Sequence, residues 1–106
     1  MPVTANRLSK SSLMTFELGF LEEALKEWGK LDSSTREQFK AKLAKRLVSP
    51  RIPSAKLSGH KDRYMIKLRS VGYRLVYEVR DSELIVIVVA VGKRERNAVY
   101  QAAARR

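Results

Sequence analysis

The run LIVIVVAVG at 84–92 is the feature that most restricts the fold of this chain. It is apolar at almost every consecutive position, so neither of its faces suits contact with water. A strand of this kind is typical of the centre of a sheet rather than of its edge. Two further strands are predicted just before it, at 64–68 and 73–80, because both are rich in Val, Ile, Leu and Tyr and are followed by the turn sequences RSVG and RDSE. The second half of the chain therefore predicts a sheet.

The first half predicts one strand and two helices. The sequence MTFELGF at 14–20 alternates as a strand does. Over 21–31, apolar residues recur at three- and four-residue intervals, which indicates one apolar stripe on a helix. A second helix is predicted to begin at Ser34, where Glu37 completes a capping box, and to end before Pro50. The expected fold class is α+β: an antiparallel-rich mixed sheet of about four strands, with a two-helix hairpin on one face and a short C-terminal helix.

The pairing of the two middle strands can be predicted from burial. If Leu68 pairs with Tyr73 across the RSVG turn, the alternating apolar residues of both strands lie on one face, toward the helical hairpin. A shift of one residue would move all of them to the other face. This register places Lys67 opposite Arg74 on the face that we expect to be uncovered.

Basic residues are expected to gather at one end of this sheet. The last strand runs back antiparallel, so its C-terminal end lies beside the RSVG turn. The basic residues that converge there are Lys67, Arg69, Arg74, Lys93 and Arg94. Arg96 begins the predicted last helix, and Tyr100 lies about one turn along on the same side. Like charges this close repel by roughly 1 kcal/mol per pair at intermediate dielectric, so the cluster favours an anionic partner. The alternative is that the long side chains spread apart into solvent.

Composition points the same way. Lys and Arg number 22 against 11 Asp and Glu, a net charge of +11, which favours nucleic acid, a ribosome, an acidic protein or an anionic membrane surface. The absence of cysteine excludes disulfides and thiolate metal sites, and is typical of a reducing cytoplasm. No apolar run approaches the ~20 residues of a membrane-spanning helix. We expect a flexible extension at 1–13 and one domain at 14–106.

Other titratable residues carry no chemistry that we predict. His60 stands in a polar loop without a paired acid or base, so a structural or solvent-facing role is expected. Glu78 and Glu83 are interpreted as ordinary strand and turn charges. No carboxylate cluster suggests a metal site, and no cofactor is predicted.

Four segments resemble a known family: ALKEWGKL, SPRIPSAKLSG, YMIKLRSVGYRLVYEV and VVAVGKRERNAVY. They resemble the RelE toxins of bacterial toxin–antitoxin modules, in the RelE/ParE superfamily, and the likeness extends from Met14 to Tyr100. It implies the fold class predicted above. It also implies a metal-independent endoribonuclease that cuts mRNA in the ribosomal A site. The 2′-hydroxyl would attack the adjacent phosphate, leaving a 2′,3′-cyclic phosphate and a 5′-hydroxyl.

The resemblance also implies roles for individual residues. Lys67 would act as the base, a role that suits an amine among other cations. Arg74 would stabilise the charge that develops on phosphate, and Arg94 would hold the phosphate and protonate the leaving oxygen. Tyr100 would orient the substrate by stacking on a base. The residues expected to bind substrate around them are Arg69, Lys93 and Arg96.

The chain departs from the RelE pattern at two positions. Met65 stands where a second lysine is usual, and Ser58 stands where an arginine is frequent, so both departures lower the positive charge. The expected partners are a RelB-like antitoxin, the ribosome and mRNA. We expect no membrane partner, contact with DNA only through a toxin–antitoxin repressor complex, and a bacterial or archaeal cytoplasm. Two alternatives stay open: a ParE-like toxin that inhibits gyrase, and a catalytically weakened RNA-binding relative.

Overall fold

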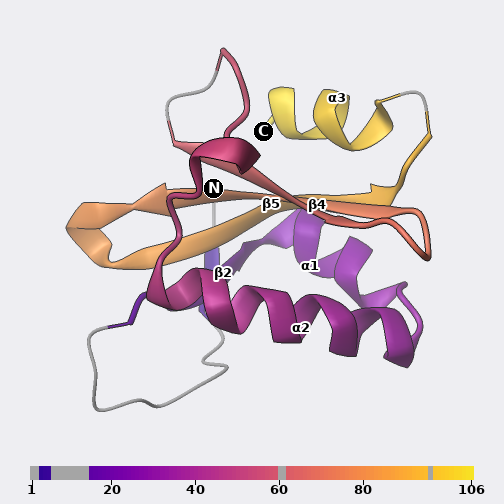
Figure 1. The fold of residues 1–106 in the computed structure, drawn as a ribbon, viewed down its shortest axis with the longest axis horizontal. Coiled ribbons are helices and arrows are strands. Elements are labelled where there is room, and N and C mark those ends of the chain that lie inside the picture. Colours follow the sequence, from indigo (N-terminus) through magenta and orange to yellow (C-terminus); the bar gives the residue numbers. More distant parts are fainter. Residues whose placement is uncertain (1–2, 6–14, 60–61, 96) are drawn as a thin grey trace.

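The computed structural model describes residues 3–5, 15–59, 62–95 and 97–106, and its centre is a five-stranded sheet (Figure 1). The order across the sheet is β1-β2-β5-β4-β3. The strands are β1 (Val3–Ala5), β2 (Glu17–Leu21), β3 (Arg63–Leu68), β4 (Tyr73–Arg80) and β5 (Ile85–Lys93). Only the pairing of β2 with β5 is parallel. The predicted mixed, antiparallel-rich sheet is thus confirmed, with β1 as an additional strand.

Strand β5 lies in the middle of the sheet, as its apolar sequence predicts. Every side chain from Ile85 to Val91 is buried. β5 is hydrogen-bonded to β2 on one side and to β4 on the other, so it has no free edge. Burial on both faces explains why this strand tolerates no alternating polar residue.

The helical hairpin covers one face of the sheet. It consists of α1 (Glu22–Gly29) and α2 (Ser33–Val48), which lie side by side below the sheet in Figure 1. Phe39 and Leu43 of α2 are fully buried, and the Trp28 ring of α1 contacts the Phe39 ring with centroids 6.2 Å apart. These contacts make one apolar core between the two helices and the sheet.

The start of α2 differs from the prediction. Its N-cap is Asp32, whose carboxylate accepts a hydrogen bond from the Thr35 backbone N–H at 3.3 Å. Ser34 lies inside the helix, and Glu37 forms an ion pair with Lys40 at 3.1 Å in place of a capping box. Asp and Ser cap helices about equally well, so the sequence offered two competing starts. The earlier start prevails and buries Thr35.

The predicted register of β3 and β4 is confirmed. Leu68 pairs with Tyr73, and Lys67 pairs with Arg74. Tyr64 pairs with Tyr77, and their rings stack with centroids 5.6 Å apart. The basic pair therefore lies on the face opposite the helical hairpin.

That opposite face is not uncovered, which corrects the prediction. The last helix, α3 (Ala98–Ala104), lies over it, on the other side of the sheet from α1 and α2 (Figure 1). Val99 and Ala103 of α3 are buried. The sheet has apolar side chains such as Val76 on this face as well, and these need cover from water.

The expected N-terminal extension includes β1, which pairs antiparallel with β2 at the edge of the sheet. The rest of 1–13 lies outside the described residues, and the division into extension and domain stays a prediction. Among the helices that the structure describes, none combines the length and apolar character needed to cross a bilayer.

Candidate active site

The predicted basic cluster surrounds a hollow at one end of the sheet. This sheet-end hollow has a volume of about 130 Å³ and is formed by the end of β3, the β3–β4 turn, the start of β4 and the residue after β5. Its lining residues are Lys67, Leu68, Arg69, Gly72, Tyr73, Arg74 and Arg94. Four cations therefore share one concavity, as the sequence predicts.

Two backbone hydrogen bonds around Gly72 hold this arrangement. The Gly72 N–H donates to the Leu68 carbonyl at 2.9 Å and closes the turn. The Gly72 carbonyl accepts from the Arg94 N–H at 2.7 Å, which ties the end of β5 to the turn. Gly72 has a φ of 69°, a left-handed conformation that glycine adopts without steric cost. The convergence of Arg94 with the β3–β4 turn is thus fixed by the backbone.

Arg74 is the most enclosed cation of the site. Its guanidinium carbon lies 5.9 Å from the centre of the Tyr100 ring, a cation–π contact between β4 and α3. Its Nε atom is buried and has no hydrogen-bond partner within the described part of the chain. Buried donors without partners are rare in native proteins, and a functional site is one accepted explanation for them.

A second, narrower depression adjoins the sheet-end hollow. Arg74 and Arg94 line both, and Lys93 and Tyr100 line only the second. Lys93 pairs with Tyr73, so its side chain lies on the opposite face of the sheet from Arg74. It therefore reaches the site only at its margin. Of the predicted site residues, Arg96 lies outside the described residues. His60, for which a structural or solvent-facing role is predicted, lies outside them too.

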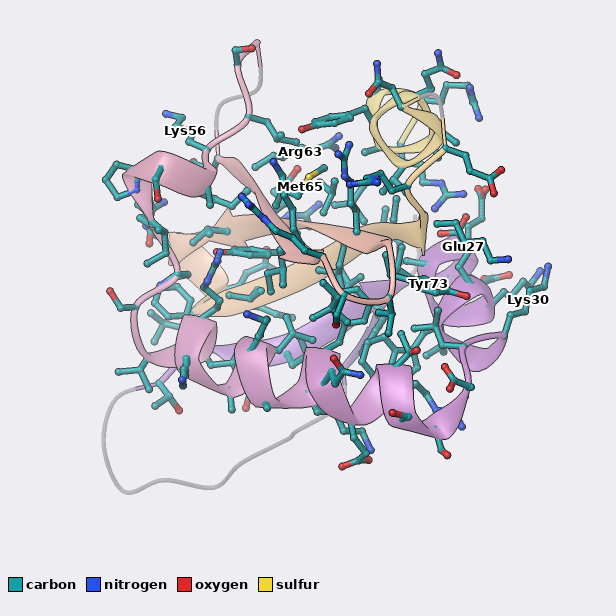
Figure 2. The ribbon with its side chains drawn as sticks, turned by 45° about the vertical axis from the view of Figure 1, so that its right-hand side comes forward. Glu27, Lys30, Lys56, Arg63, Met65 and Tyr73 are labelled. Atoms are coloured by element: carbon teal, nitrogen blue, oxygen red, sulfur yellow. The ribbon has the colours of Figure 1, made fainter. Side chains whose placement is uncertain are left out.

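The two departures from the RelE pattern lie in different surroundings. Met65 is only 4% exposed, and Figure 2 shows its sulfur on the α3 side of the sheet. It belongs to the core and does not line the sheet-end hollow. Ser58 is exposed and lines a groove of about 590 Å³ between the connector and α3. Tyr100 lines this α3 groove too, so the groove lies next to the basic site.

Sequence reasoning missed three polar residues of the α3 groove: Lys56, Asn97 and Gln101. Lys56 belongs to the connector before β3 and is exposed, as its label in Figure 2 shows. No local pattern joins residues so far apart in the chain, and only the position of α3 brings them together.

Glu78 is more than an ordinary strand charge. One carboxylate oxygen accepts from Arg63 Nε at 3.0 Å and the other from Arg80 Nε at 2.9 Å. Arg63 also donates to the carbonyl of Ala103 at 2.6 Å, so this network joins β3 and β4 to α3. Burial by itself would raise the pKa of Glu78, but the hydrogen bonds from Arg80 and Arg63 bring that pKa below its ordinary value.

Removing the charge of Glu78 should alter how stability depends on pH. A carboxyl whose pKa is lowered by folding stabilises the protein above its ordinary pKa of 4.5 and loses this effect as pH falls. We expect Glu78→Gln to lower the free energy of unfolding by about 1 kcal/mol at pH 7. The difference from the unmodified protein should close toward pH 3. Urea unfolding across this range measures it, and Glu83→Gln, at an exposed turn position, should show no such change.

No metal site is visible among the residues that the structure describes, since no three His, Cys, Asp or Glu side chains gather there. Nitrogen donors from Lys and Arg carry positive charge and repel a cation. The site is therefore suited to an anion held by hydrogen bonds and charge.

Comparison with known proteins places this arrangement in a family. Residues 18–98 match the model of the ParE toxin of type II toxin–antitoxin systems. The chain belongs to the RelE/ParE family of toxins. It is 57% identical over 93 residues to the mRNA interferase toxin RelE of Escherichia coli K12 and to the mRNA interferase RelE of Shigella flexneri. Each alignment covers 88% of this chain and 98% of the relative.

Solved structures agree with this placement. An arginine-to-alanine double mutant of E. coli RelE in the free state superimposes with a TM-score of 0.81 at 54% identity, covering 87% of this toxin and 97% of that chain. The same double mutant in complex with a peptide of the antitoxin RelB gives a TM-score of 0.74 at 55% identity, covering 86% of this toxin and 95% of that chain. The predicted resemblance to the RelE toxins is confirmed, with 18–98 matched by the family model.

Proposed function

We propose that this toxin is an mRNA interferase that cuts mRNA in the A site of the ribosome. One observation carries the proposal: Lys67, Arg74 and Arg94, from three different strand ends, meet at one hollow on a surface of strong positive charge. The relatives that are 57% identical to it over 93 residues bear the name mRNA interferase. Such a cluster weakens folding through repulsion and favours the binding of a phosphate diester.

The chemistry follows from the side chains at the hollow. Lys67 would take the proton of the 2′-hydroxyl as its oxygen attacks the adjacent phosphorus. Arg74 and Arg94 would stabilise the additional negative charge on the phosphoryl oxygens. As the bond to the 5′-oxygen breaks, that oxygen receives a proton, which we assign to Arg94. The products are a 2′,3′-cyclic phosphate and a 5′-hydroxyl, and no water is consumed.

Tyr100 would hold a base of the substrate by stacking. Its ring is half-buried against Arg74 and lines both the narrow depression and the α3 groove. A nucleotide bound in the α3 groove would therefore lie beside this ring. Stacking of a base on an aromatic side chain contributes ~1–3 kcal/mol, enough to orient the scissile linkage.

Inhibition of gyrase, as by ParE toxins, is the competing hypothesis, and the matching family model bears the ParE name. A toxin that acts only by binding a protein has no need for an arginine with a buried, unpartnered donor beside an exposed lysine. A weakened RNA-binding relative was suggested by Met65. That residue is part of the core and leaves the lining of the hollow unchanged, so it gives this reading little support.

Translation in vitro with primer extension on the mRNA distinguishes these functions. The proposal expects breaks within codons that occupy the A site, and expects none on naked mRNA. Arrest without breaks would indicate an RNA-binding relative, and the absence of both arrest and breaks would favour the gyrase target. Either result would overturn the proposal.

We further propose that a RelB-like antitoxin with an acidic surface neutralises this toxin. E. coli RelE has been solved in complex with the antitoxin RelB, and this toxin carries a net charge of +11. Opposite charge favours fast association. Failure to recover any such partner with the toxin from its native cell would contradict this.

Restoring a positive charge at Ser58 should raise activity. Ser58 lines the α3 groove beside Tyr100, so an arginine there would attract the RNA backbone near the site. We expect Ser58→Arg to increase kcat/KM about threefold to tenfold, and less at high salt. Ser82→Arg adds the same charge in the β4–β5 turn, at the opposite end of the sheet, and should leave cleavage nearly unchanged. Equal gains from both variants would show that only net charge matters.

A further inference from the structure

A partly buried ion pair joins the end of the last helix to the first helix. Arg106, two residues after α3, donates from Nη1 to Glu27 Oε1 at 2.8 Å and from Nη2 to Glu27 Oε2 at 3.0 Å. The Arg106 side chain is only 10% exposed and that of Glu27 29% exposed. Both nitrogens of one guanidinium thus bind both oxygens of one carboxylate, a geometry that fixes orientation as well as distance. We call this pair the Glu27–Arg106 latch.

The latch is also bound to the central strand. Arg106 Nη1 donates to the carbonyl of Val89 at 2.9 Å, and the N–H of Val91 donates to Glu27 Oε1 at 3.2 Å. The hydrogen bonds that Arg106 donates to Glu27 raise the pKa of the Arg106 guanidinium, which favours its charged form. The latch therefore holds three elements together: α1, β5 and the end of α3.

Besides the burial of Val99 and Ala103, helix α3 depends on such polar contacts for its position. It has only seven residues, too few to be stable by itself, and its first turn has no side-chain cap. Its other described polar anchor is the hydrogen bond from Arg63 to Ala103, also near its C-terminal end. Figure 2 shows Arg63 between β3 and α3 and Glu27 on α1. Tyr100 lies on this helix, with its ring against Arg74.

We propose that the Glu27–Arg106 latch positions Tyr100 over the active site by fixing α3 on the sheet. Glu27 and Arg106 line neither the sheet-end hollow nor the adjoining depression, so they act through Tyr100 and are positioning residues. Only the kinetic effects that we expect from this latch rest on the proposed function. The position of the Tyr100 ring can be measured without any activity.

Arg106→Gln tests the latch, and Arg105→Gln is its matched control. Both remove one positive charge from the same end of the chain, but Arg105 is exposed and has no described side-chain partner. We expect Arg106→Gln to lower kcat about 10- to 100-fold, because misplacing an orienting group slows the chemical step, with a smaller change in KM. Arg105→Gln should change neither by more than about twofold. Equal losses in the two variants would overturn the proposal.

Glu27→Gln provides a milder version of the same test. The amide oxygen can still accept from the Val91 N–H, and Arg106 loses the charge of Glu27 but keeps its ion pair with Glu23 at 3.3 Å. We expect a smaller loss of kcat than for Arg106→Gln, in a protein whose thermal unfolding remains cooperative. Normal kcat in folded forms of both variants would contradict the latch.

A double-mutant cycle with Tyr100 separates positioning from general stability. If the latch acts through Tyr100, then Arg106→Gln should cost nothing more once Tyr100→Ala has removed the ring. A purely structural role would lower activity by the same factor in both backgrounds, and that outcome would overturn the proposal.

Fluorine NMR of fluorotyrosine-labelled toxin gives a readout that does not need cleavage. The Tyr100 signal is assigned by its loss in Tyr100→Phe. We expect it to shift or broaden in Arg106→Gln and to stay unchanged in Arg105→Gln. A toxin that fails to cut mRNA but shows this pattern would overturn the proposed function and support the latch. An unchanged Tyr100 signal in Arg106→Gln would overturn the latch itself.

Discussion

Replacing Arg94 with alanine should lower the rate of mRNA cleavage by about 10³-fold while leaving the fold intact. Arg94 is exposed and lines both the sheet-end hollow and the depression next to it. Removing one group that stabilises transition-state charge typically costs 10²–10³ in kcat, and an arginine that binds a phosphoryl group can cost more. Its structural contribution is the backbone hydrogen bond to the Gly72 carbonyl, which alanine retains. Single-turnover cleavage on programmed ribosomes and a thermal melt measure the two effects separately.

Arg105→Ala is the control for charge. It removes one exposed arginine from outside the site, so any loss it shares with Arg94→Ala reflects weaker attraction to the ribosome. We expect that shared loss to be about twofold or less. A folded Arg94→Ala toxin that cuts at the normal rate would remove Arg94 from the catalytic set. It would also show that the hollow at the sheet end is not where RNA is cleaved.

Much of this site could be predicted from the sequence because strand periodicity fixes both pairing and face. The alternation over 64–68 and 73–80 leaves one register that places the alternating apolar residues of both strands on the hairpin face, and that register puts Lys67 opposite Arg74. Because β5 runs antiparallel to β4, the C-terminal end of β5 then lies beside the β3–β4 turn. The strand pattern of the sequence agrees with the observed sheet here, so the sequence predicts that these cations converge.

The position of α3 on the sheet could not be predicted, because no local sequence pattern encodes it. Its sequence indicates a helix, but its contacts with Glu27 and Arg63 join residues far apart in the chain. The face of the sheet that it covers was therefore interpreted as uncovered. The prediction of where α2 begins was wrong for a different reason. Asp32 and Ser34 are both good N-cap residues, and the choice between them depends on which start buries Thr35. β1 is three residues long, too short for periodicity to reveal.

Replacing Tyr77 with alanine should lower the free energy of unfolding by roughly 3–5 kcal/mol, the largest loss of stability that we expect from one side chain outside the active site. Tyr77 is fully buried, and its ring stacks on that of Tyr64. Its hydroxyl donates to the Pro50 carbonyl at 2.6 Å and accepts from Arg46 Nη1 at 2.8 Å. One side chain thus joins β4 to the end of α2 and to the connector that follows it.

Tyr77→Phe separates the ring from the hydroxyl. It keeps the apolar volume but leaves the buried Pro50 carbonyl without its donor, so we expect a loss of about 1–3 kcal/mol. Tyr73→Phe, at a half-buried tyrosine of the same strand, should cost less than about 0.5 kcal/mol. Urea unfolding with an unchanged m-value measures all three variants. Equal stability of Tyr77→Phe and the unmodified toxin would show that the hydroxyl does not hold the connector. Because Tyr77 pairs with β3 at the end of that strand away from the hollow, cleavage by the folded Tyr77→Phe toxin should stay normal.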